Sequence, residues 1–112
     1  MKLSNIVTEL DLEIVAGYNL ENENNEPQGV YICDLLSLVM GKAKEHDIWI
    51  TIQTHVNIVA VASLVDITAI IVSEGIEIDE DTKAKASEVN IPIFRSNLSS
   101  YDLATKLNSL GV

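Results

Sequence analysis

Short apolar runs and amphipathic stretches take turns along the chain. The apolar runs are rich in Ile and Val and have the length of buried strands, whereas the amphipathic stretches repeat their apolar residues at helical spacing. The strands are predicted at residues 12–16, 48–52, 68–72 and 91–94. The helices are predicted at residues 32–43, 56–65, 79–90 and 99–110. Strands that alternate with helices favour crossover connections and parallel pairing. We therefore expect one α/β domain over residues 1–112, three-layer-like, with a mainly parallel sheet of about four strands.

Three of these elements carry further signals. The helix at 56–65 is almost wholly apolar, so either another subunit covers it or the sheet and its neighbours wrap it closely. Pro92 near the start of the fourth strand indicates an edge or an early, unpaired position. Ser99 and Asp102 resemble a capping box at the start of the last helix.

The segment from Tyr18 to Gly29 is rich in Asn and Glu and is predicted to be a loop. Its composition favours a solvated surface loop. The alternative is a lid over whatever the strand ends bind.

Charge and cysteine content restrict the class of protein. Asp and Glu number 17 against 7 Lys and Arg, a formal net charge of −10, which argues against nucleic acid and anionic membranes as partners. Cys33 is the only cysteine, so no internal disulfide forms, which fits a reducing compartment. No signal-peptide core follows Met1, and Asp66 interrupts the most apolar stretch. We expect a soluble, cytoplasmic protein.

Polar residues gather where the predicted strands end. In an open parallel sheet, ligands bind beyond the carboxyl ends of the strands, and helix amino termini there can hold anions. The predicted ligand-binding residues are Gln53, Thr54, His55, Asn57, Glu74, Gly75, Ser96 and Asn97. The competing interpretation is that several of them only cap helices or form turns.

No catalytic or metal-binding pattern is visible in the sequence. Phosphate-binding glycine loops and the nucleophile elbow are missing. His55 has no carboxylate nearby in the sequence to orient it as a general base, and Cys33 lies in no metal-ligand spacing. We expect no catalytic residue, no metal and no cofactor, and therefore a protein that is not an enzyme.

Several segments resemble the DRTGG domain family. They include Asp-Leu-Leu-Ser at 34–37, Asn-Ile-Val-Ala-Val-Ala at 57–62, Ile-Ile-Val at 70–72 before Glu74 and Gly75, and Ile-Pro-Ile at 91–93. The resemblance covers nearly the whole chain. The signature that gives the family its name is absent, and the matching region is Glu-Pro-Gln-Gly at 26–29, in which only Gly29 agrees.

The resemblance implies a regulatory domain. DRTGG domains stand alone, adjoin CBS domains or form the middle part of some phosphate acetyltransferases, and their fold is similar to the N-terminal domain of HPr kinase/phosphorylase, which lacks the kinase site. We expect a non-catalytic module that senses a small polar metabolite, with a nucleotide or phosphorylated metabolite as partner. The alternative is a homodimeric interaction or assembly domain without a small ligand.

Overall fold

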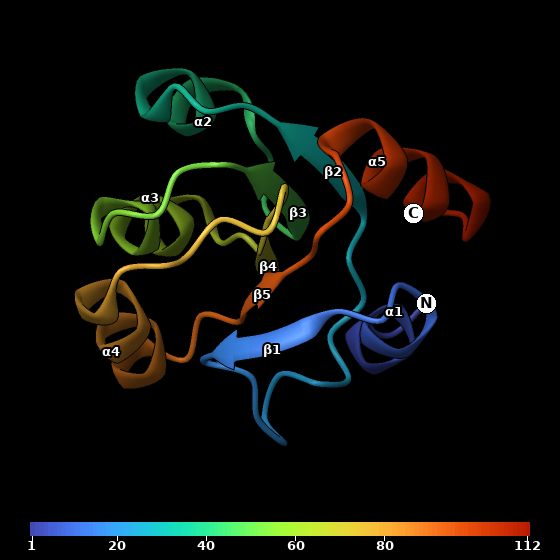
Figure 1. Ribbon diagram of the computed structural model, residues 1–112, viewed down its shortest axis with the longest axis horizontal. Helices are drawn as coiled ribbons and strands as arrows, with labels where there is room; N and C mark the ends of the chain where they lie inside the picture. The colour runs from blue at the N-terminus through green and yellow to red at the C-terminus, as the bar shows by residue number, and fades with distance from the viewer.

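Five strands form one sheet in the order β1-β5-β4-β3-β2 in the computed structural model, which describes residues 1–112 (Figure 1). The strands are β1 (Glu13–Ala16), β2 (Gly29–Ile32), β3 (Asp47–Thr51), β4 (Ala69–Val72) and β5 (Ile93–Arg95). The pairs β2–β3, β3–β4 and β4–β5 are parallel, and β1 pairs antiparallel with β5. The predicted α/β class is confirmed, with five strands in place of about four.

Helices cover both faces of the sheet. They are α1 (Leu3–Glu9), α2 (Leu36–Lys42), α3 (Asn57–Val65), α4 (Glu80–Val89) and α5 (Ser100–Ser109). Figure 1 shows α1 and α5 on one face and α2, α3 and α4 on the other. Each face has its own core: Ile50 and Ile71 point to the α1 and α5 side, whereas Trp49 and Ile70 point to the other. The alternation follows from the two-residue period of a strand. No helix is both long and apolar enough to cross a membrane.

The predicted helix at 32–43 is wrong in its first part. Residues 29–32 form β2, where Ile32 pairs with Ile50, and the helix begins only at Leu36. Of the apolar stripe predicted to be buried, Val39 alone is fully buried, and Leu35 and Met40 are exposed. A four-residue strand followed by a seven-residue helix leaves too little chain for either period to be resolved in the sequence.

The helix α1 is also absent from the predicted elements. Leu3, Ile6 and Leu10 stand at helical spacing, and all three are buried against the sheet. This spacing was the available signal for the helix. Its amino terminus carries no side-chain cap, so the usual start signal is missing.

Of the two positions predicted from Pro92, the early position at the strand start is confirmed and the sheet edge is wrong. The strand after Pro92 is β5, which lies inside the sheet between β1 and β4 rather than at an edge. Pro92 is tolerated because it stands immediately before the strand, where the sheet needs no N–H donor from it. Its carbonyl oxygen accepts from the Ile70 N–H at 2.9 Å. The actual edges are β1 and β2.

Neighbouring helices wrap α3. It lies between α2 and α4, and Ile58, Val59, Val61 and Ala62 are buried against the sheet and these neighbours. Leu64 is exposed. The apolar side chains of α3 are therefore buried largely by other elements of the same chain.

The loop from 17 to 28 crosses the full width of the sheet at the wrong end for a lid. It leaves β1 at Ala16, which pairs with Ile93 at the amino end of β5, and reaches β2 beside the amino end of β3. The lid interpretation is therefore wrong, because the carboxyl ends of the parallel strands lie at the opposite edge. Asn22 anchors the loop: its side chain is buried and donates to the carbonyls of Gly17 (2.8 Å) and Asn90 (3.3 Å).

Candidate functional site

The carboxyl ends of β2, β3, β4 and β5 meet at one edge of the sheet, as predicted. The predicted site residues follow β3, β4 and β5 along this edge. They fall into two hydrogen-bonded groups, one around Asp79 and one between the loops after β4 and β5, with Gln53 and Asn57 outside both.

Asp79 is the centre of the first group. Its carboxylate lies 3.2 Å from His55 Nδ1 and accepts from Thr54 Oγ1 at 3.4 Å. Thr82 Oγ1 donates to the Thr54 carbonyl at 2.6 Å. Asp79 occupies the N-cap position of α4, yet its side chain forms no cap hydrogen bond with that helix. The carboxylate is instead directed across to the chain that leads into α3.

This arrangement corrects the expectation that no carboxylate orients His55. The partner lies 24 residues away in sequence and is brought close by the packing of α4 beside α3. The His55 side chain is 74% exposed, and Asp79 occupies its Nδ1. Nε2 is the ring nitrogen left to meet a ligand.

The second group locks two loops together. The Glu74 N–H donates to the Leu98 carbonyl at 2.9 Å, and the Gly75 N–H donates to the Ser96 carbonyl at 2.8 Å. Gly75 has φ +65°, and a Cβ there would stand 2.5 Å from Asn97 Oδ1. The backbone of this group is therefore committed to holding the loops, which favours the turn interpretation for Glu74 and Gly75.

Gln53 and Asn57 are not joined to either group. Gln53 Nε2 donates to the Asp34 carbonyl at 3.0 Å, and Asn57 is exposed at the first position of α3. Asp34 was not among the predicted site residues. Its carboxylate accepts from Thr51 Oγ1 (2.8 Å) and the Ile52 N–H (3.0 Å), so it fastens the end of β3 to the chain after β2.

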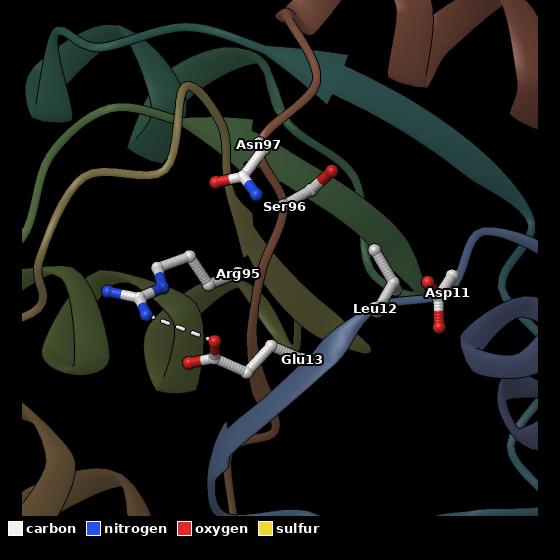
Figure 2. Close-up of a pocket in the computed structure, with 6 residues that line it drawn as sticks. All are labelled: Asp11, Leu12, Glu13, Arg95, Ser96 and Asn97. Atoms are coloured by element: carbon white, nitrogen blue, oxygen red, sulfur yellow. Dashed lines mark hydrogen bonds and ion pairs between the residues drawn. The ribbon is translucent and has the colours of Figure 1, made fainter.

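A hollow of about 300 Å³ opens at this edge beside β1 and β5. Its lining residues are Asp11, Leu12, Glu13, Arg95, Ser96 and Asn97 (Figure 2). A second hollow of about 370 Å³ shares Asp11, Ser96 and Asn97 and adds Lys106 and Leu98 among others. Of the eight predicted residues, only Ser96 and Asn97 line a hollow.

Arg95 is neutralised by two glutamates. Figure 2 shows the Arg95 side chain reaching from β5 towards Glu13. Arg95 Nη2 lies 3.0 Å from Glu13 Oε1, and Arg95 Nη1 lies 2.9 Å from Glu77 Oε1. The hydrogen bond from Arg95 holds the pKa of Glu77 below its usual value, and the hydrogen bonds to Glu77 and Glu13 raise the pKa of Arg95. The hollow therefore presents hydrogen-bond acceptors more than free positive charge.

Comparison with known proteins settles the family. The model of the DRTGG domain matches residues 5–110. The chain belongs to the DRTGG domain family. No curated protein matches the chain.

One solved structure is similar to this DRTGG domain over nearly its full length. It contains the CBS and DRTGG domains of the regulatory region of Clostridium perfringens pyrophosphatase, complexed with its activator, diadenosine tetraphosphate. The TM-score is 0.77 at 20% sequence identity. The match covers 95% of this chain and 45% of the other, so the present chain spans less than half of that regulatory region. The similarity confirms the fold.

Gly29, the residue that we expect to match the family signature, lies where a side chain would not fit. Gly29 begins β2, and a Cβ there would lie 2.7 Å from Asp47 Oδ1. Asp47 is buried, and its other carboxylate oxygen accepts from the Lys44 N–H at 2.9 Å. Gly29 thus lies where the crossing loop joins the sheet, at the amino ends of the strands and away from the predicted site.

Proposed function

We propose that this DRTGG domain is a non-catalytic regulatory module that senses a small polar metabolite, of the nucleotide class, at the carboxyl ends of its strands. The observation that carries the proposal is the pair of adjoining hollows beside β1 and β5, which share Asp11, Ser96 and Asn97. Such a concave, polar-lined place at the carboxyl edge of an α/β sheet is where ligands bind in this fold class.

Different lining residues would bind different parts of a nucleotide. Asp11 and Glu13 offer acceptors for hydroxyl and amino groups, whereas Lys106 at the neighbouring hollow offers the positive charge that a phosphate requires. The solved regulatory region that contains a DRTGG domain is activated by a dinucleotide, which supports the nucleotide class. We further propose a cytoplasmic location, which the single cysteine fits.

The other predicted contacts remain proposals. They are Gln53, Thr54, His55, Asn57, Glu74 and Gly75. Among them, His55 is largely exposed, and Asp79 holds it and Thr54 together at the same edge of the sheet.

Thermal unfolding with a panel of ligands tests the proposal. AMP, ATP, diadenosine tetraphosphate and acetyl phosphate are each added in excess, and a ligand at about 100 times its Kd raises the stability by about 2.7 kcal/mol. Asn97→Ala and Lys106→Ala should abolish the stabilisation, while Asn108→Ala and Lys85→Ala, on exposed helix positions outside the hollows, should preserve it. If no compound of the panel raises the melting temperature, the proposal is wrong.

A second candidate function, homodimeric assembly, is favoured by one surface. An apolar patch lies around the ends of β2 and β3 and the start of α2. Its members are Ile32, Leu35, Leu38, Ile52 and Val56, all of them exposed. None of the five patch residues is charged, and Asp34 is the carboxylate beside them, bonded to the Ile52 N–H. In a chain of net charge −10, two acidic copies approach most easily through the surface that carries the least charge.

Light scattering of the purified chain tests assembly. We expect a dimer that Leu35→Glu together with Leu38→Glu converts to a monomer. Leu64→Glu is the matched control, because Leu64 is also exposed and apolar but lies outside the patch. A monomer in the unmodified chain, over the full concentration range, excludes this candidate.

A further inference from the structure

The open edge of β2 carries a groove of about 400 Å³. β2 pairs with β3 on one side and with no strand on the other, at the end of the row of strands in Figure 1. The groove is lined by Gln28, Gly29, Val30, Tyr31, Lys42, Lys44 and Asp47. It lies beside the amino ends of β2 and β3, separate from the hollows of the proposed ligand site.

The strand edge itself is available for pairing. An edge strand presents N–H and C=O groups to which another extended segment can hydrogen-bond. Outside the sheet, no backbone hydrogen bond of the chain reaches Gly29, Val30 or Tyr31. Gly29 has no side chain to hinder the approach of a second backbone.

The groove is positive in an acidic protein. Lys42 and Lys44 are exposed, and neither forms an ion pair, whereas Lys83 and Lys85 on α4 each pair with a glutamate. Asp47 adds little to the surface charge because it is buried and bonded to the Lys44 N–H. The formal net charge of the whole chain is −10, so the two unpaired lysines give this groove a charge opposite to that of the protein as a whole.

We propose that the β2 edge binds an extended acidic peptide segment of a partner protein by strand addition. The backbone of the segment pairs with β2, and its carboxylates face Lys42 and Lys44. A second copy of this chain matches the groove less well, because its own β2 edge brings the same two lysines, and the Asp47 carboxylate there is buried and cannot meet them. The inference goes beyond the proposed ligand sensing, since it concerns a different edge of the sheet and a macromolecular partner.

Selection from a phage library of random peptides on the immobilised full chain tests the proposal. We expect enriched sequences that combine Asp or Glu with β-branched residues. Synthetic copies of them are then measured by fluorescence anisotropy. Lys42→Glu with Lys44→Glu should weaken binding about tenfold, and the control Lys83→Glu with Lys85→Glu, which changes the net charge equally, should leave it within about twofold. Methylation of alternate backbone nitrogens in the peptide should abolish binding, because it removes the donors that pair with the strand.

Three outcomes overturn the proposal. One is a set of enriched peptides without acidic residues, or no enrichment at all. Another is binding that Lys42→Glu with Lys44→Glu leaves unchanged while its circular dichroism spectrum shows an intact fold. The third is a dimer of the unmodified chain that this double variant dissociates, which would assign the edge to a second copy. None of these measurements involves a nucleotide, so the ligand-sensing proposal stands or falls separately.

Discussion

The carboxylate of Asp34 accepts a hydrogen bond from Thr51 Oγ1 at 2.8 Å. Thr51 is fully buried at the end of β3, and Asp34 stands two residues beyond β2. The same carboxylate oxygen accepts from the Ile52 N–H, and the Asp34 carbonyl accepts from Gln53 Nε2. Asp34 therefore fastens the ends of β2 and β3 together beside the apolar patch and fixes the direction in which the chain leaves for α2.

Asp34→Ala should lower the free energy of unfolding by about 2 kcal/mol, because it leaves the Thr51 hydroxyl and the Ile52 N–H without their acceptor. Asp34→Asn retains an acceptor oxygen and should lose roughly half as much. Urea unfolding measures both. Glu45→Ala, at an exposed position, is the control, and a loss in Asp34→Ala no larger than in this control would contradict the assigned role.

Two glycine substitutions should act in opposite directions. Gly17→Ala should destabilise the fold by about 3 kcal/mol, because the residue has φ +73° and a Cβ would clash with the Ile91 carbonyl oxygen. Gly41→Ala should stabilise α2 by up to about 1 kcal/mol, since a Cβ there meets nothing within 4 Å. Thermal and urea unfolding measure both variants in the same background. Changes of the same sign in the free energy of unfolding would contradict the roles given to the two glycines.

Asn22→Ala should loosen the loop that crosses the sheet. The substitution removes a buried side chain that bonds to the carbonyls of Gly17 and Asn90 and also accepts from the Asn19 N–H at 3.0 Å. We expect a loss of about 2 kcal/mol and faster amide exchange across residues 17–28. Asn24→Ala, at an exposed position in the same loop, should change neither quantity.

The Arg95–Glu77 pair should make stability depend on pH in the acid range. The pKa of Glu77 is lowered from its usual 4.5, first by the hydrogen bond from Arg95 and then by its charge. The folded state thus binds fewer protons than the unfolded state, so the contribution is complete above pH 4.5 and is lost as the pH falls through the lowered pKa. Wild type should have a higher urea midpoint than Glu77→Gln at neutral pH, and this difference in midpoint should shrink as the pH falls below 4.5 and through the lowered pKa of Glu77.

The effect is small because Glu77 is exposed, and added salt should narrow the gap at neutral pH. A gap between wild type and Glu77→Gln that widened on acidification would contradict a lowered pKa of Glu77 in the folded state.

The sequence predicts the elements that have a full period and a recognisable cap. The last helix is the clearest case: Ser99 Oγ accepts from the Asp102 N–H at 3.1 Å, and Leu103 and Leu107 are buried. It fails where an element is too short to show its period, as in β2, or where the cap signal is missing, as in α1. The antiparallel direction of β1 could not be predicted either. It depends on the path of the twelve-residue loop from Gly17 to Gln28.

The candidate site was also predictable only in part. That polar residues would gather at one edge follows from the parallel sheet alone, and Ser96 and Asn97 do line its hollows. The contribution of Arg95 and Glu13 could not be foreseen, since it requires β1 to lie antiparallel beside β5. The Asp79 carboxylate beside His55 was equally hidden, because the contact joins the starts of two different helices.

The far placement of β1 has a consequence for the order in which the chain assembles. The units that run from β2 to β5 through α2, α3 and α4 close contacts between near neighbours in sequence, whereas Glu13 must find Arg95 across 82 residues. Closing so long a loop is slow compared with forming the local units. We expect β1 and the helix before it to dock last, onto a nearly finished parallel sheet. During synthesis, β1 cannot pair until β5 has been made, so the segment of α1 and β1 remains exposed to proteases until then.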